Sequence, residues 1–212
     1  IPIGQPLLIK TGFVLSSAGL VLSVPGKVNA ESATFYIKKG IKNYYENDHY
    51  GAISDYTKAI EIDPNNASAY YNRGLSRKLI KDNYGAISDY TKAIEINPQF
   101  SDAYRDRAVS KRILKDYDGA ISDYTKAIEI NPKDYKAYYN RGNLKIDLKD
   151  NYGAISDYTK AIEINPNNAN AYNNRGIVKE KIGDLQGACS DWRQKIFLSP
   201  NDDVAKLVKE LC

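Results

Sequence analysis

The chain has 212 residues, of which 42% are apolar and 26% are charged, and its formal net charge at pH 7 is only +4. This composition is typical of a soluble helical protein. Nucleic-acid-binding proteins usually carry a strongly basic stripe, and a net charge this low does not indicate one. We therefore expect no nucleic-acid partner.

The first thirty residues differ from the rest of the chain. An apolar stretch from Gly12 to Val24 is followed by a Pro-Gly pair and then by Val28-Asn29-Ala30. A short apolar core before a cleavage site of this kind is typical of a secretory signal peptide. We therefore predict that residues 1–30 are a signal peptide, cleaved after Ala30, and that the protein is exported to a periplasm, a lumen or the extracellular space.

Two alternatives stay open for this segment. One alternative to the signal peptide is an uncleaved membrane anchor, and we expect membrane contact only in that case. The other is an apolar tail that lies on the first repeat. The apolar run is short for a spanning helix of about 20 residues.

A fourteen-residue segment, GAISDYTKAIEINP, occurs at 85–98, 119–132 and 153–166, and at 51–64 it returns with Asp63 in place of Asn. An altered fifth copy starts at Gly187, and successive copies start 34 residues apart. A fixed period between 20 and 50 residues indicates a solenoid, in which each unit buries its apolar face only against its neighbours. The repeats therefore predict a single quasi-linear domain.

Each unit is predicted to hold two helices. In residues 67–100 they cover 67–80 and 84–96, with Asn66 as the N-cap of the first and Asp82 or Asn83 as the N-cap of the second. Pro98 ends the unit, because the residue before a proline is pushed out of the α region. Helices of this length are marginal alone, so packing must stabilise them.

These repeats resemble the tetratricopeptide repeat family. The family's 34-residue pattern is matched by Tyr70-x2-Arg73-Gly74…Ala86-x3-Tyr90…Pro98. The resemblance covers five repeats, at 33–66, 67–100, 101–134, 135–168 and 169–202, and residues 203–212 resemble a capping helix. It implies an all-α, right-handed α-solenoid whose first helices line a concave groove.

Charged residues border the apolar stripes of both helices. An Arg stands at the seventh position of four repeats, and an Asp stands at the twenty-third position of all five. We predict Arg–Asp pairs within or between units, because an unpaired charge there would be costly. The cations are Arg73, Arg107, Arg141 and Arg175, with Lys39 in the first repeat, and the aspartates are Asp55, Asp89, Asp123, Asp157 and Asp191. Lys81, Lys115 and Lys149 stand where the family usually has Gly. Either these lysines are left-handed, at a cost of about 1–2 kcal/mol each, or the turn is built differently.

The resemblance places the variable residues of the first helices in the groove. Asn72, Asn140 and Asn174 share the sixth position, where amides can bind the backbone of an extended peptide. The alternative is that these asparagines only solvate a recurring helical turn. The remaining candidate peptide-binding residues are Tyr71, Tyr139, Lys78, Arg105, Arg112 and Lys136.

Aromatic and Arg side chains are common binding anchors, and guanidinium groups suit carboxylates. An acidic or C-terminal peptide is therefore the sharper hypothesis, although Asp102, Asp106 and Asp147 offset the positive charge and exposed cations often serve solubility alone. The residues of the family's carboxylate clamp for chaperone C-termini are not present in three successive repeats.

The sequence has two cysteines, Cys189 in the last repeat and Cys212 in the segment that follows it. An oxidising compartment would let them form a disulfide that ties the capping segment to the last repeat. Two buried thiols are the open alternative.

The sequence shows none of the usual catalytic patterns. His49 is the only histidine and is expected in a solvated turn, the cysteines lack metal-ligand spacing, and no phosphate-binding loop occurs. We expect no enzyme activity, no cofactor and no metal.

The leading hypothesis is a non-catalytic scaffold that binds a protein or an extended, acidic peptide. The alternative is a self-associating or membrane-tethered assembly hub that uses the terminal repeats and residues 1–30. A monomer is the favoured oligomeric state.

Overall fold

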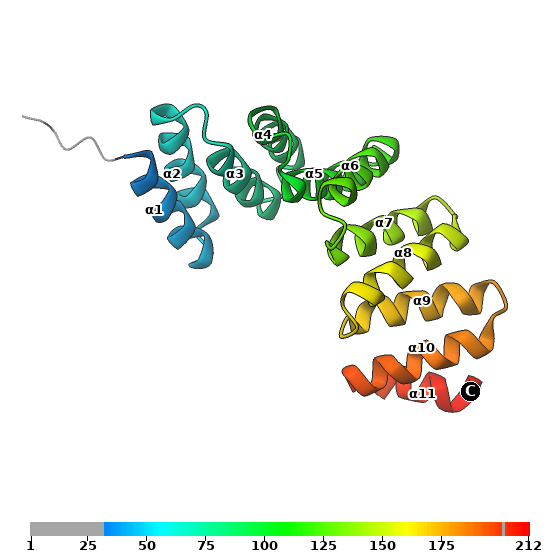
Figure 1. Cartoon of the computed structure of the whole chain (residues 1–212). Helices are drawn as coiled ribbons and strands as arrows, with labels where there is room; N and C mark the ends of the chain where they lie inside the picture. The colour runs from blue at the N-terminus through cyan, green and yellow to red at the C-terminus, as the bar shows by residue number, and fades with distance from the viewer. Residues whose placement is uncertain (1–31, 201) are drawn as a thin grey trace, which may run out of the picture. The chain divides into compact units, whose positions relative to one another are not determined.

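The computed structural model describes residues 32–200 and 202–212, so the predicted signal peptide lies outside the described residues. The described chain is helical and forms five consecutive helix pairs followed by one further helix (Figure 1). The helices are α1 (Ala33–Tyr45), α2 (His49–Ile62), α3 (Ala67–Leu79), α4 (Asn83–Ile96), α5 (Ser101–Ile113), α6 (Tyr117–Ile130), α7 (Tyr135–Asp147), α8 (Asn151–Ile164), α9 (Ala169–Lys181), α10 (Leu185–Leu198) and α11 (Asp202–Leu211).

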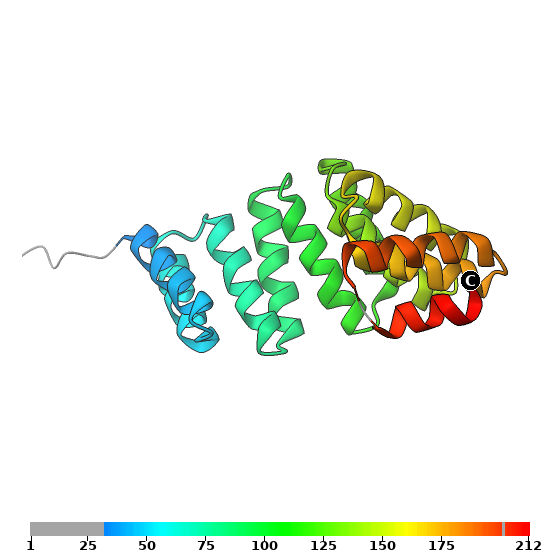
Figure 2. The same cartoon turned by 90° about the horizontal axis from the view of Figure 1, so that it is seen from below.

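Neighbouring pairs stack on one another along residues 32–212. The second helix of each pair contacts the first helix of the next, and α1, α3, α5 and α7 contact one another in succession. Helix α11 packs on α10, as Figures 1 and 2 both show. The predicted α-solenoid with a capping helix is therefore confirmed.

Side-chain caps start most of the helices. Asn66 Oδ1 accepts a hydrogen bond from the backbone N–H of Ala69 at 3.1 Å, and Asp82 Oδ1 accepts one from Gly85 at 2.9 Å. Asp82, rather than Asn83, is therefore the N-cap of α4. The prediction of a solvated turn at His49 was wrong: Asp48 caps α2, so His49 is the first residue of that helix, and its ring lies 5.6 Å from the ring of Tyr44.

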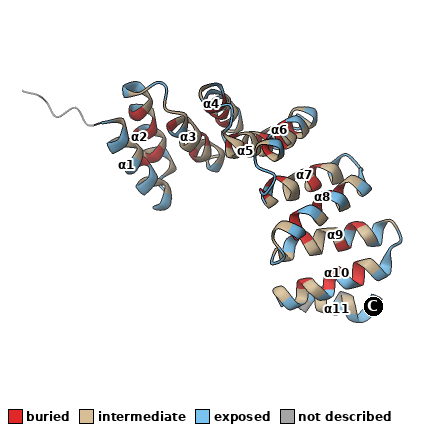
Figure 3. Ribbon diagram, viewed as in Figure 1, coloured by how far each residue is buried: buried red, intermediate tan, exposed pale blue. Residues whose placement is uncertain are grey.

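The core of each pair is an aromatic side chain against a small residue. Tyr56, Tyr90, Tyr124, Tyr158 and Trp192 are all buried, one in each second helix. Figure 3 shows buried segments along the helices of each pair. A Cβ placed on Gly74 would lie 2.7 Å from Cε1 of Tyr90, which explains why this helix pair needs a glycine at that position. Close packing of this kind stabilises helices that would be marginal alone.

The predicted Arg–Asp pairs are confirmed for all four arginines, each within its own repeat, whereas Asp55 of the first repeat contacts Lys39 Nζ at 3.3 Å. Arg73 donates from Nε and Nη2 to both carboxylate oxygens of Asp89, at 3.0 and 2.7 Å. Its Nη1 also donates to Thr57 Oγ1 of the preceding repeat at 3.1 Å. The same bidentate pair and threonine contact recur in the next three repeats. Each guanidinium thus joins its own helix pair to the previous one.

The turn after the first helix uses a left-handed residue in every repeat. Of the two possibilities for the lysines, the structure shows the left-handed one: Lys81, Lys115 and Lys149 have φ values of 66°, 65° and 62°, and Asn47 and Gly183 have 62° and 88°. Only Gly183 adopts this conformation without the steric cost of a Cβ.

A disulfide joins Cys189 of α10 to Cys212, 23 residues later. Because Cys212 directly follows α11, the bond ties the end of the capping helix to the last helix pair.

Candidate functional site

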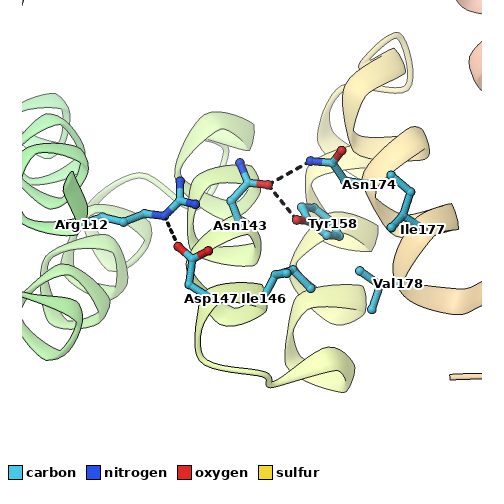
Figure 4. Close-up of a pocket in the computed structure, with 8 residues that line it drawn as sticks. All are labelled: Arg112, Asn143, Ile146, Asp147, Tyr158, Asn174, Ile177 and Val178. Atoms are coloured by element: carbon cyan, nitrogen blue, oxygen red, sulfur yellow. Dashed lines mark hydrogen bonds and ion pairs between the residues drawn. The ribbon is translucent and has the colours of Figure 1, made fainter. Parts of the chain in front are cut away.

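A hollow of about 290 Å³ lies among the first helices of the third, fourth and fifth repeats (Figure 4). We call it the α7–α9 hollow, since most of its lining comes from those helices. It is lined by Arg112, Asn143, Ile146, Asp147, Tyr158, Asn174, Ile177 and Val178.

One side of the hollow is a network of amides and tyrosine hydroxyls. Tyr158 donates its hydroxyl hydrogen to Asn143 Oδ1 at 2.7 Å, and Asn174 Nδ2 donates to the same oxygen at 3.0 Å and to the Tyr139 hydroxyl at 3.1 Å. Burial raises the pKa of Tyr158, so its hydroxyl keeps its proton and remains a donor at neutral pH.

This network leaves the Nδ2 group of the Asn143 side chain available to a ligand. Its carbonyl oxygen already accepts two hydrogen bonds, which fix the orientation of the side chain. Within the described part of the chain, its Nδ2 group makes no hydrogen bond, although it carries two N–H donors. Figure 4 shows this nitrogen directed away from Asn174 and Tyr158. The hollow therefore presents a fixed, unused donor to a ligand.

The other side of the hollow is apolar, with a charged pair at its edge. Ile146, Ile177 and Val178 line it, and Ile177 is 48% exposed although it lies in a concave part of the surface. At the edge, Arg112 Nε donates to Asp147 Oδ2 at 2.6 Å, and both side chains remain about one third exposed. An apolar side chain and a hydrogen-bonding backbone could both be bound here.

A second cluster surrounds Asp106 on α5. The carboxylate accepts hydrogen bonds from the Tyr71 hydroxyl at 2.9 Å, from Lys78 Nζ at 2.8 Å and from Arg105 Nη2 at 3.1 Å. Arg105 Nη1 contacts two further carboxylates, those of Asp102 at 2.5 Å and Asp134 at 2.7 Å. Burial alone would raise the pKa of Asp106, but the nearby Lys78 and Arg105 charges lower it overall.

The structure thus divides the predicted site residues into three groups. Tyr71, Lys78 and Arg105 are drawn together around Asp106, where their polar groups are used within the protein. Tyr139, Asn174 and Arg112 lie at the α7–α9 hollow.

The remaining three predicted residues do not join either cluster. Asn72 lines a smaller hollow of about 160 Å³ beside Ile41 and Tyr44. Asn140 is half-buried and Lys136 is exposed, and neither side chain has a polar partner among the residues that the structure describes. The three amides of the predicted row therefore have different surroundings.

Sequence reasoning missed the residues that shape the hollow, above all Asn143, Ile146 and Ile177. A signal for Asn143 was present: it is polar at a position where the other repeats carry an aliphatic residue. These aliphatic residues are Ile41, Leu75, Val109 and Ile177.

The described residues contain no cluster of three or more His, Cys, Asp or Glu side chains that could hold a metal ion. Within the same residues, none of the helices has both the length and the apolar character needed to cross a membrane.

Comparison with known protein families identifies the fold. The family model described as TPR repeat matches residues 43–78, 110–149 and 142–183, and the model described as tetratricopeptide repeat matches residues 67–100. The chain belongs to the tetratricopeptide repeat family. No curated protein sequence matches it.

Several solved structures share this arrangement. The crystal structure of the MamA protein is 26% identical, with a TM-score of 0.71 over 83% of this chain and 95% of that chain. YrrB, described as a TPR protein with an unusual peptide-binding site, is 23% identical, with a TM-score of 0.68 over 86% of this chain and 94% of that chain. At that identity the likeness to YrrB concerns the fold alone.

A third similar structure contains a ligand. The first TPR of Spaghetti (RPAP3), bound to the HSP90 peptide SRMEEVD, is 26% identical with a TM-score of 0.55. The match covers 57% of this chain and 95% of that chain. Proteins of this family are generally non-catalytic scaffolds.

Proposed function

We propose that this protein is a non-catalytic scaffold that binds an extended segment of a partner protein, with an apolar side chain of that segment in the α7–α9 hollow. The observation that carries this proposal is the free amide of Asn143, held in place beside Ile146 and Ile177. The amide donates to a backbone carbonyl of the ligand, and the two isoleucines contact the side chain next to it.

The comparison with RPAP3 supports a peptide as the ligand class. That protein is bound to a peptide in its solved structure and shares the helical fold of this chain. A peptide also fits the chemistry of the hollow, because its backbone offers acceptors at regular spacing and its side chains alternate in direction.

The finer part of the proposal is an acidic residue next to the apolar anchor. Arg112 contacts Asp147 through Nε, and its side chain remains 35% exposed at the edge of the hollow. Arg105 is a poorer anchor than the sequence suggested, since three carboxylates already surround it and its side chain is only 13% exposed. Arg112 is therefore the cation that we assign to an acidic residue of the ligand.

A selection from phage-displayed random linear peptides on the full chain tests this proposal. Asn143→Val and Ile177→Ser should each weaken the selected peptides roughly five- to tenfold, which corresponds to about 1–1.5 kcal/mol. Val stands at the same position in the third repeat, as Val109, so the first variant keeps a side chain that the fold accepts. Fluorescence anisotropy gives the dissociation constants.

Ile113→Ser is the matched control, because Ile113 is 56% exposed and lies outside the hollow. Equal binding by all variants would place the site elsewhere, and a selection that yields no binding peptide would contradict the proposal. Enrichment of Asp and Glu that disappears with Arg112→Gln supports the acidic part. Absence of such enrichment in the unmodified protein rejects that part alone.

We propose further that the protein works in an oxidising compartment after export. The disulfide between Cys189 and Cys212 supports this, because such bonds persist mainly outside the cytosol. Intact mass of the protein from its native source tests it: a mature chain starting at Glu31, with both thiols oxidised, is expected. A reduced chain that retains residues 1–30 would contradict export with cleavage and favour the membrane-anchored alternative.

A further inference from the structure

A second hollow, of about 160 Å³, lies between the first helices of the first two repeats. We call it the α1–α3 hollow, because most of its lining comes from those helices. Its lining residues are Ile41, Tyr44, Tyr45, Tyr56, Asn72 and Leu75. Each of them has its equivalent, three repeats of 34 residues later, among the residues that line the α7–α9 hollow. The same places in the repeat therefore form a hollow at the first and at the last junction between first helices.

Cations occupy one of these places at the two junctions in between. Where the α1–α3 hollow has Tyr44, the next two repeats have Lys78 and Arg112. Lys78 Nζ contacts Asp106 on the following first helix at 2.8 Å, and Arg112 Nε contacts Asp147 on the following first helix at 2.6 Å. A long charged side chain thus crosses each middle junction, whereas both hollows have an uncharged residue at this place.

Asn72 gives the α1–α3 hollow a polar group that the protein itself does not use. Within the described residues its side chain makes no hydrogen bond, although an amide carries both donors and an acceptor. The equivalent residue of the next repeat is Asp106, whose carboxylate already binds Lys78. Beside the amide lies Ile41, which is 37% exposed. The hollow therefore combines apolar surface with a group that can bind a peptide backbone, as the α7–α9 hollow does.

The exposed face of α1 at this hollow carries positive charge. Lys38, Ile41, Lys42 and Tyr45 lie on one face, because they are spaced by three, one and three residues, and all four are exposed. Lys38 forms no ion pair within the described part of the chain. Lys42 contacts Glu46 only at 3.8 Å, and its side chain is 72% exposed. A ligand with acidic residues next to apolar ones is therefore complementary to this face.

We propose that the α1–α3 hollow is a second binding site for the same ligand, an extended segment with two apolar anchors, each beside an acidic residue. This inference rests on the proposed function, because the class of ligand is taken from the α7–α9 hollow. The first helices contact one another in succession from α1 to α7, so one extended segment can follow them from one hollow to the other. The α1–α3 hollow is the smaller of the two and takes the smaller anchor.

A selection on a variant without the α7–α9 hollow tests the second site by itself. The bait is the full chain with Asn143→Val and Ile177→Ser, and the probes are phage-displayed random linear peptides. We expect the selected peptides to carry an apolar residue beside Asp or Glu. Ile41→Ser, added to the bait, should weaken these peptides roughly five- to tenfold, because it removes apolar contact in the hollow.

A second variant closes the hollow in the way that the protein closes the next junction. Tyr44→Lys with Asn72→Asp copies the pair that Lys78 forms with Asp106, and binding by the selected peptides should be lost. Leu79→Ser is the matched control, because Leu79 is 47% exposed and does not line the hollow. It should leave the affinity unchanged. Circular dichroism melts establish that each variant is folded before its affinity is compared.

A tandem peptide tests whether one ligand uses both hollows. It joins the peptides selected for the two hollows through Gly-Ser linkers of about 5 to 30 residues. Against the unmodified protein, one linker length should raise the affinity at least about tenfold over the tighter single peptide, because the second contact becomes intramolecular. Ile41→Ser should remove most of this gain.

Two outcomes would overturn the inference while the proposed function stands. One is a selection on the double variant that yields no peptide, or peptides that are insensitive to both changes in the α1–α3 hollow. The other is a tandem peptide without a gain in affinity at any linker length, which rejects a ligand shared by the two hollows. Failure of the proposed function looks different, because peptides selected on the unmodified protein would then be unaffected by Asn143→Val.

Discussion

Arg107 and Asp123 form a bidentate ion pair inside the third repeat, sixteen residues apart, with Nε to Oδ2 at 2.8 Å and Nη2 to Oδ1 at 2.7 Å. Lys111 Nζ contacts the same carboxylate at 2.8 Å, and Arg107 Nη1 donates to Thr91 of the preceding repeat at 2.9 Å. Asp123 therefore balances two cations whose side chains are less than one fifth exposed.

Asp123→Ala should lower the free energy of unfolding by about 3–5 kcal/mol, because it leaves two partly buried cations without their counter-charge. Urea denaturation followed by circular dichroism measures this loss. Lys126→Ala is the control: it removes a cation from an exposed pair, with a cost of about 0–1 kcal/mol. Similar losses in both variants would mean that the inner pair has no special structural role.

Lys115→Gly should stabilise the protein by about 0.5–1 kcal/mol. Lys115 has a φ of 65°, which costs about 1–2 kcal/mol for a residue with a Cβ, and the extra freedom of glycine in the unfolded chain offsets part of the gain. Gly183→Lys in the fifth repeat should lower the stability, because Gly183 has a φ of 88°, which is unfavourable for a residue with a Cβ. Nothing lies within 4 Å of the added Cβ, so this variant reports the backbone effect without a steric clash. Thermal denaturation of both variants checks the signs, and a loss from Lys115→Gly would contradict the strain argument.

Cys212→Ser should destabilise the C-terminal end by roughly 3 kcal/mol, the loop-closure estimate for a disulfide across 23 residues. The loss should be local, because each unit of a solenoid contacts only its neighbours. Hydrogen exchange should accelerate in α11 and α10 while α3 and α4 keep their protection. Uniform acceleration along the whole chain would show that the disulfide acts globally.

Asp106 should contribute a pH-dependent part of the stability. Burial raises its pKa, but Lys78 and Arg105 lower it below the ordinary value, so the folded state holds the carboxylate more strongly ionised than the unfolded state does. The resulting stabilisation is present above about pH 4, the unfolded pKa, and is lost as the pH falls through the lower folded pKa. The unmodified protein should therefore exceed Asp106→Asn in unfolding free energy at pH 6, and the difference should shrink toward pH 3. Asp118→Asn, at an exposed position, is the control, and a difference that does not change with pH would contradict the assignment.

Much of the fold follows from the sequence because each repeat meets the same neighbours. The 34-residue spacing, the small residues opposite Tyr90 and its equivalents, and the closing prolines predict the helix pairs. The Arg–Asp pairs were predictable for the same reason, since Arg73 and Asp89 recur together at the edges of the apolar stripes. His49 was misplaced because Asp48 caps α2, so the helix begins at His49 itself.

The candidate site could be predicted only in part. The resemblance put Tyr139, Asn174 and Arg112 on the groove side of the first helices, and they do lie at the α7–α9 hollow. The sequence did not show that Arg105 would be surrounded by Asp102, Asp106 and Asp134. The sequence shows how many charged residues the groove contains. Whether a charged side chain can bind a ligand depends on whether it already has a partner within the protein, and that is visible only in the structure.

The sequence by itself determined the repeat, the helix pairs and the family, because these depend on contacts that are short in sequence and identical in each unit. Only the tertiary structure decided which groove residues remain available to a ligand. Those contacts join residues about one repeat apart, such as Asn174 with Asn143 and Arg112 with Asp147, and they form only when neighbouring pairs are stacked at a particular angle and height. The side chains at these positions differ between repeats, so no internal pattern in the chain records how they pair.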